Sequence, residues 1–160
     1  MVAAAKLRRA QENIISARPY AYKLGALIKH LARNEEVPQN PLIKPRDVKN
    51  IMIVVVTADR SLCGAFNTNI IRYVNNLLKG DLKSKLDNNN VKLVTVGRKG
   101  DEFFTKRHFP VVFRHANFFN HLNFDDATKV INYCVAEFSS GRVDEVHVVY
   151  NEFKSAIQQN

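Results

Sequence analysis

The sequence predicts an α/β protein, in which a long N-terminal coiled-coil helix precedes an open, mostly parallel β-sheet domain. Three observations lead to this prediction. Apolar residues recur at heptad spacing as far as Leu31, a continuous apolar run IMIVVV occupies 51–56, and strand-like and helix-like segments alternate from there onward. Such alternation is typical of parallel strands joined by helices. With 160 residues the chain is about one domain with an appendage.

Residues 1–34 are expected to form one coiled-coil helix. Its apolar residues are spaced alternately four and three apart, with many Lys and Arg between them. A sustained repeat of this kind is typical of a left-handed coiled coil rather than of a helix lying on its own globular core. Pro19 falls outside this seam and removes one helical hydrogen bond, so we expect a local bend there. The seam consists of Ala3, Leu7, Ala10, Ile14, Ala17, Ala21, Leu24, Ile28 and Leu31.

A coiled coil needs a second helix, and no later segment shows a 3.5-residue period. The partner helix is therefore expected in another chain or in a part of the protein that this sequence lacks. We favour the second, because the chain opens inside the heptad pattern and closes in FKSAIQQN directly after a predicted strand. The basic, Ala-rich start is not interpreted as a transit peptide, because its heptad pattern continues for many helical turns.

The remaining segments predict a proline-containing linker at 35–49 and an α/β domain at 50–160. The β-branched run at 51–56 is what a strand buried on both faces of a parallel sheet requires. Gly80 is expected to end the first helix of the domain, and Asn123 precedes the last one. A turn is expected at 87–90. The expected strands are 51–56, 91–96, 111–113 and 145–150, and the expected helices 67–78, 99–107 and 124–138, which together predict a Rossmann-like domain.

The formal charge of +9 predicts an acidic partner: nucleic acid, anionic lipid or an acidic protein surface. The basic positions of the first helix could neutralise phosphates. The apolar seam beside them favours a protein partner instead, and no aromatic residues are interleaved as stacking platforms for bases. We therefore expect no nucleic acid. The basic face consists of Lys6, Arg8, Arg9 and Arg18.

Neither a metal site nor a disulfide framework is predicted, because Cys63 and Cys134 have no C-x-x-C spacing. The histidines likewise lack a ligand spacing. No cofactor is expected. No run approaches the roughly 18 apolar residues that cross a bilayer.

The stretch TADRSLCGAFNTN (57–69) lies between a predicted strand and a predicted helix. Its small-x-nucleophile-x-small pattern around Cys63 resembles the elbow that exposes the nucleophile of α/β hydrolases. A cysteine at a helix N-terminus also has a lowered pKa. An elbow needs a base, and no histidine has a context that singles it out. A small α/β enzyme with a Cys63 nucleophile is thus the alternative function, with His108, His115, His121 and His147 as the available bases.

A phosphate-binding turn is not predicted. The stretch 57–69 holds one glycine where G-x-G-x-x-G needs three, and G-K-[ST] is absent. GRKG (97–100) follows a strand, but a turn that starts a helix explains its two glycines. We expect no direct nucleotide binding by this chain.

MVAAAKLRRAQENIISARPYA (1–21) and TADRSLCGAFNTNIIR (57–72) resemble the gamma subunits of F-type ATP synthases, which form the central rotor stalk. Their order and separation match, as does the alternation that follows. The resemblance implies an antiparallel coiled coil of N- and C-terminal helices with an α/β domain between them. This sequence would then lack the start of the N-terminal helix and the whole C-terminal helix, which would be the partner of the seam.

The resemblance also implies the function of a non-catalytic rotor subunit of a proton-translocating ATP synthase. Such a subunit couples rotation of the membrane ring to ATP synthesis or hydrolysis in the hexamer of alpha and beta subunits. The hexamer binds the nucleotide, so no catalytic residue is expected in this chain. The implied partners are the alpha, beta and epsilon subunits and the membrane c-ring. The implied location is peripheral, on the cytoplasmic face of the bacterial inner membrane or, alternatively, on an organellar inner or thylakoid membrane.

For individual residues, the resemblance implies a basic shaft face that meets an acidic lever segment of beta. It also implies an exposed docking loop near that lever, within 59–67, in which Cys63 is a small residue and Ser61 stands where the family usually has glycine. GRKGDEFF (97–104) would lie in the lower part of the domain, which contacts the ring and epsilon. The docking residues are Asp59, Arg60, Ser61, Leu62, Cys63 and Gly64.

Overall fold

The computed structural model describes residues 2–32, 40–60, 64–117 and 123–152. It divides into two compact units, residues 1–44 and 45–160, and each is described by itself. The expected linker is therefore shared between the units. Its end is held by the α/β domain, because Arg46 Nη1 donates to the carbonyl of Phe138 at 2.7 Å and the guanidinium lies 3.9 Å from the centre of that ring.

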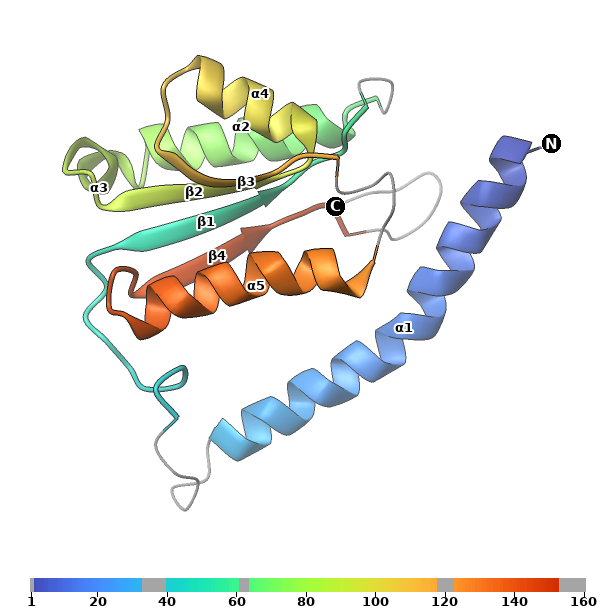
Figure 1. The fold of residues 1–160 in the computed structure, drawn as a ribbon, viewed down its shortest axis with the longest axis horizontal. Helices are drawn as coiled ribbons and strands as arrows, with labels where there is room; N and C mark the ends of the chain where they lie inside the picture. The colour runs from blue at the N-terminus through green and yellow to red at the C-terminus, as the bar shows by residue number, and fades with distance from the viewer. Residues whose placement is uncertain (1, 33–39, 61–63, 118–122, 153–160) are drawn as a thin grey trace. The chain divides into compact units, whose positions relative to one another are not determined.

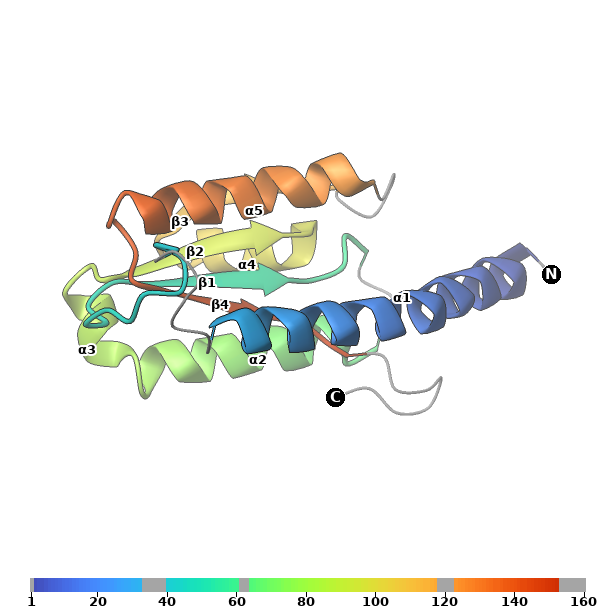
Figure 2. The same ribbon diagram turned by 90° about the horizontal axis from the view of Figure 1, so that it is seen from below.

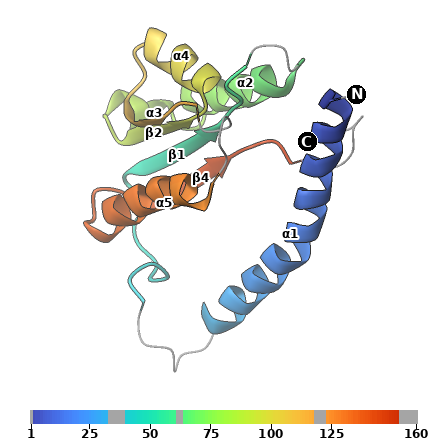
Figure 3. The same ribbon diagram turned by 45° about the vertical axis from the view of Figure 1, so that its right-hand side comes forward.

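The first unit is dominated by α1 (Val2–Ala32), a continuous helix that contains Pro19. Its axis curves about half way along (Figures 1 and 3), which agrees with the bend expected from a missing N–H. Apolar seam residues of α1 are largely exposed, with Leu7 at 55 % and Ile28 at 52 %. No described helix is both long and apolar enough to cross a membrane.

The second unit is built on a four-stranded sheet of β1 (Ile51–Val56), β2 (Val91–Val96), β3 (Val111–His115) and β4 (Glu145–Val149), in the order β3-β2-β1-β4. Every neighbouring pair is parallel. The predicted fold class is confirmed.

Helices cover both faces of this sheet, as Figure 2 shows. α2 (Phe66–Lys79) and α4 (Arg98–Lys106) pack on one face and α5 (Phe124–Ser139) on the other. Alternate residues of β1 point to opposite faces, as the pleat requires. Ile51, Ile53 and Val55 pack with Ile70, Val74, Leu78 and Phe104, whereas Met52 and Val54 pack with Val130 and Cys134.

The boundaries agree with the sequence to within one residue, apart from two larger differences. β3 extends to His115 rather than ending at 113, and a short helix, α3 (Lys83–Asp87), was not predicted. Leu82 and Leu86, four residues apart, pack against the core from this segment. As expected, Gly80 follows the last residue of α2, and Asn123 precedes the first residue of α5.

Candidate docking surface at the carboxyl ends of the strands

The loop that follows β1 is tied to the loops that follow β2 and β3. The carboxylate of Asp59, only 5 % exposed, accepts hydrogen bonds through Oδ1 from the backbone N–H of Arg98 at 2.9 Å and of Asn117 at 3.0 Å. In a parallel sheet the carboxyl ends of all strands meet at one edge, so residues distant in sequence become neighbours there. Asp59 therefore holds three loops together.

Asn67 closes the same loop from its other end. Its Oδ1 accepts from the N–H of Ala58 at 2.8 Å, and its Nδ2 donates to the carbonyl of Arg60 at 3.0 Å. Its side chain thereby satisfies two backbone groups that no strand or helix serves. The loop is thus anchored at Asp59 and at Asn67, both buried, while Arg60 and Gly64 are exposed. Ser61, Leu62 and Cys63 of the predicted docking residues lie outside the described residues.

The two glycines of GRKG permit close packing against Thr57. A Cβ on Gly97, which has φ +86°, would lie 1.8 Å from the carbonyl oxygen of Thr57. Gly100 donates its N–H to Thr57 Oγ1 at 2.8 Å, and Lys99 donates its N–H to the carbonyl of Ala58 at 3.3 Å. The first amides of α4 are therefore engaged by residues 57–59, which leaves them no role in holding a phosphate.

Cys63, the nucleophile of the alternative elbow, and His121, one of its possible bases, lie outside the described residues. His115 lies at the carboxyl edge of the sheet, but its Nε2 is 3.5 Å from Asp126 Oδ1 on α5. His147 Nε2 lies 3.2 Å from Glu145 Oε1 within β4, and His108 follows α4 at the opposite end of the sheet. Cys134 is 6 % exposed in the core, where burial raises the pKa of its thiol.

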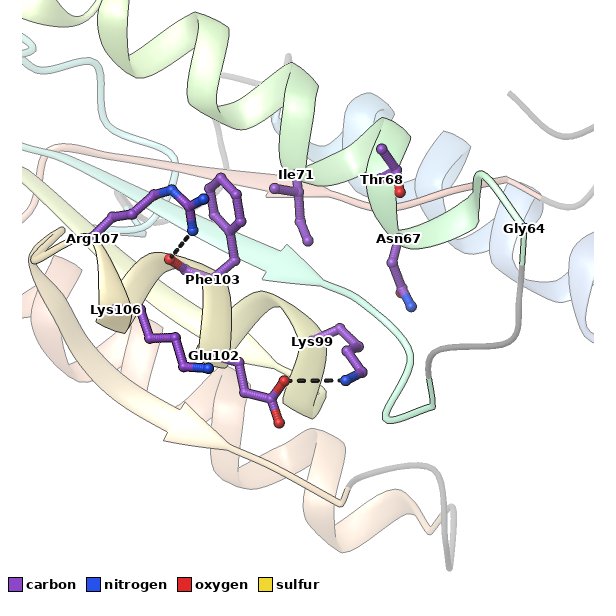
Figure 4. A pocket seen from close by; sticks show the side chains of 9 residues that line it. All are labelled: Gly64, Asn67, Thr68, Ile71, Lys99, Glu102, Phe103, Lys106 and Arg107. Carbon is purple, nitrogen blue, oxygen red and sulfur yellow. Dashed lines mark hydrogen bonds and ion pairs between the residues drawn. The ribbon is translucent and has the colours of Figure 1, made fainter.

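Beside the anchored loop, α2 and α4 border a groove of about 340 Å³ (Figure 4). The wall on the α4 side combines positive charge with an aromatic ring, and its residues recur at the spacing of one helical face. The opposite wall is formed by small, polar and apolar residues. The lining residues are Gly64, Asn67, Thr68 and Ile71 on one side and Lys99, Glu102, Phe103, Lys106 and Arg107 on the other.

The charges of this groove are only partly balanced. Lys99 Nζ lies 3.1 Å from Glu102 Oε2, and this hydrogen bond holds the pKa of Glu102 below its ordinary value. The guanidinium of Arg107 lies 3.8 Å from the centre of the Phe103 ring, and its Nη1 donates to the Phe103 carbonyl at 3.4 Å. Lys106 forms no ion pair with any residue that the structure describes.

The sequence reasoning missed the groove and the anchoring role of Asn67. The groove did have a sequence signal, because Lys99, Phe103 and Arg107 are spaced four apart and so share a helical face. Of the predicted basic shaft face, Arg8 is exposed and pairs through Nε with Glu12 Oε1 at 3.0 Å. The side chains of Ala3 and Lys6 lie outside the described residues.

Comparison with known proteins covers the whole chain. Residues 1–160 match the sequence profile of a family described as ATP synthase. The chain is 46 % identical to the ATP synthase gamma chain of Chloroherpeton thalassium, over 100 % of this chain and 53 % of that protein. It is 42 % identical to the gamma chain of Salinibacter ruber, over 100 % and 52 % of the two chains. The chain thus spans about half the length of these relatives.

Solved structures show the same fold. The central stalk and c-ring structure of the mitochondrial ATP synthase of Tetrahymena thermophila matches with a TM-score of 0.57 and 28 % identity, over 88 % of this chain and 65 % of that one. The rotor of the Euglena gracilis mitochondrial ATP synthase, with a TM-score of 0.54 and 18 % identity over 92 % and 53 % of the chains, supports the fold alone. The chain therefore belongs to the ATP synthase family, as a relative of its gamma chains.

Proposed function

We propose that this chain is part of the non-catalytic central-stalk subunit of a proton-translocating F-type ATP synthase. The observation that carries the proposal is the identity of 46 % to a gamma chain, which extends over the whole of this chain. In this function the protein couples rotation of the membrane ring to ATP synthesis or hydrolysis in an alpha/beta hexamer. The hexamer holds the nucleotide, and this chain transmits force.

The exposed seam of α1 supports a shaft role. A helix with a continuous apolar stripe gains stability by burying that stripe against another helix. Gamma-chain relatives are about twice as long as this chain. We infer that the seam packs against a C-terminal helix of the full-length protein.

The anchored loop at 59–67 supports a docking role. A loop that transmits force needs rigidly held ends. Asp59 and Asn67 hold the two ends of the loop at 59–67 through four hydrogen bonds to backbone groups. Because Asp59 is buried, its role is to hold the loop, whereas Arg60 and Gly64 are exposed. We infer that the loop contacts the lever segment of beta.

The positive charge of the chain suits a surface that slides past an acidic partner. Exposed arginines such as Arg8 and Arg9 attract an acidic surface without being desolvated. A deeply buried ion pair would have to be broken at each step of rotation, at considerable cost. We infer that the basic face of α1 meets an acidic segment of beta. We also infer peripheral attachment, through epsilon and the c-ring, to the cytoplasmic face of a bacterial inner membrane.

A native pull-down of the tagged full-length protein tests the proposal. We expect alpha and beta subunits, identified by mass spectrometry, together with ATPase activity in the eluate. An untagged strain provides the control for nonspecific binding. Recovery of the protein alone, with rapid alkylation of Cys63 at neutral pH, would contradict the proposal and favour the small Cys63 enzyme.

A further inference from the structure

We propose that residues 46–50, which lead into β1, form a load-bearing joint through which torque passes between α1 and the α/β domain. We call these residues the entry segment. The inference rests on the proposed function, because a rotor subunit must pass torque along its chain. All the contacts that carry the inference lie within the α/β domain, where three other elements hold the entry segment.

Arg46 fixes the start of the entry segment to the end of α5. Its Nη1 donates to the carbonyl of Phe138 at 2.7 Å, and its guanidinium lies 3.9 Å from the centre of the Phe138 ring. The planar guanidinium thus makes two different contacts with one residue, which restricts its rotation more than a single hydrogen bond would. The start of the entry segment is therefore held by a side chain as well as by the backbone.

The main chain of the entry segment is held at both donors and acceptors. Lys85 Nζ, from α3, donates to the carbonyls of Val48 at 2.7 Å and of Lys49 at 3.3 Å. The carboxylate of Asp144, which precedes β4, accepts through Oδ2 from the N–H groups of Lys49 at 3.1 Å and of Asn50 at 2.8 Å. Each of these hydrogen bonds has one charged partner, so each is stronger than a hydrogen bond between neutral groups.

The elements that hold the entry segment lie on opposite faces of the sheet. Leu82 and Leu86 pack the α3 segment against the core on the side of α2 and α4, whereas α5 covers the other face (Figure 2). The entry segment continues into β1, which pairs with β2 on one side and with β4 on the other. A force on residue 46 toward either face is therefore resisted by a contact with α3 or α5, and a force in the plane of the sheet is resisted by the ladders of β1.

The contacts of Arg46 and Lys85 exceed what the start of a strand needs. The carboxylate of Asp144 already satisfies the N–H groups that precede β1. A polypeptide turns about its φ and ψ angles unless further contacts fix them, so the backbone alone would bend under torque. With the additional contacts, a load that enters at Arg46 is spread over α3, α5 and β1.

The torsional stiffness of the rotor tests this inference in the complete assembly. The alpha/beta hexamer is fixed to a surface, a bead is attached at the exposed position 81 of the full-length protein, and the angular spread of the bead is recorded during pauses in ATP-driven rotation. Lys85→Met removes the donor but keeps an aliphatic side chain, and it should widen this spread at least twofold. Lys83→Met, the same change at an exposed position of α3, should leave the spread unchanged, as should Lys85→Arg, which retains donors. Equal spreads for Lys85→Met and Lys83→Met would overturn the inference.

Arg46→Met repeats the test at the contact with α5, with the exposed Lys44→Met as its matched control. We expect the same widening from Arg46→Met, and an unchanged spread would also overturn the inference. The spread is measured only in assembled, rotating complexes, so a lower stability of the free protein does not alter it. Failure of the wild-type protein to recover alpha and beta rejects the proposed function, whereas rotation with unchanged stiffness in the two variants rejects the joint alone.

Discussion

The carboxylate of Asp59 accepts a hydrogen bond from the backbone N–H of Asn117, 58 residues further along the chain, at 3.0 Å. The same oxygen accepts from the N–H of Arg98. This carboxylate is buried, so water cannot easily replace it as the hydrogen-bond acceptor. The position of the loop after β1 therefore depends on this side chain, and the first prediction follows from it.

Asp59→Ala leaves two amide donors without their acceptor. Unsatisfied buried donors cost about 1–3 kcal/mol each, so we expect the free energy of unfolding of the full-length protein to fall by about 2 kcal/mol or more. Urea denaturation measures the change. Asp81→Ala, at an exposed position in the turn after α2, is the matched control. Equal denaturation midpoints for the two variants would show that Asp59 does not anchor the loops.

Replacing Gly97 or Gly141 by alanine distinguishes the cost of a steric clash from the cost of backbone strain. Both have positive φ, +86° and +73°, but an added Cβ at Gly97 meets the Thr57 carbonyl at 1.8 Å, and at Gly141 it meets nothing within 4 Å. Gly141→Ala should therefore cost only the conformational term of about 1–2 kcal/mol. Gly97→Ala should cost clearly more, because α4 must move away from Thr57. Thermal unfolding of the two variants measures the difference, and similar losses would contradict the close packing.

The pH dependence of stability should depend on Glu137. Arg142 first, then Lys92, hold the pKa of this carboxyl below its ordinary value of 4.5 through hydrogen bonds at 2.6–2.9 Å. Because the pKa is lower in the folded state, Glu137 stabilises the fold fully above about pH 4.5, and this contribution is lost as the pH falls through the folded-state pKa.

Glu137→Gln should therefore be less stable than the wild type at pH 7 and should lose less further stability between pH 5 and pH 3. Urea denaturation across this range measures both slopes. A Glu137→Gln slope as steep as that of the wild type would contradict this assignment.

Elements of the fold that depend on residues close together in the sequence were predicted better than those that depend on distant residues. The strand at 51–56 and the start of the helix at Phe124 depend on neighbouring residues, and both were predicted correctly. α3 was missed, because its five residues are too few to show a helical period and Leu82 and Leu86 are held by tertiary packing.

The candidate site was less accessible to sequence reasoning. Asp59 contacts residues 39 and 58 positions away, and no local pattern specifies such partners. The same holds for Gly97, whose local interpretation as a turn glycine did not include its approach to Thr57. The docking loop was named only through the family resemblance, and Ser61–Cys63 lie outside the described residues.

Cys63→Ser tests the remaining enzyme hypothesis. If the hexamer performs the chemistry, a thiol in the docking loop has no part in bond breaking, so ATP turnover by the assembled complex should stay within about twofold of the wild type. Steady-state ATPase rates of the purified complex measure it. A loss of several orders of magnitude, of the kind that removal of a nucleophile causes, would restore the catalytic interpretation of this loop.

Ile14 and Ile15 are adjacent on α1, but only Ile14 belongs to the heptad seam. Both are exposed in this chain, at 40 % and 60 %. If the seam packs against a C-terminal helix, Ile14→Asp places a charge in an apolar interface and should block assembly of the full-length protein with alpha and beta. Ile15→Asp makes the same change outside the seam and should permit assembly. Co-purification of alpha and beta measures both, with Leu7→Asp as a second seam variant. Normal assembly and coupled ATPase activity in the seam variants would rule out a coiled coil, because a buried aspartate on the interface cannot be accommodated without a large loss of pairing.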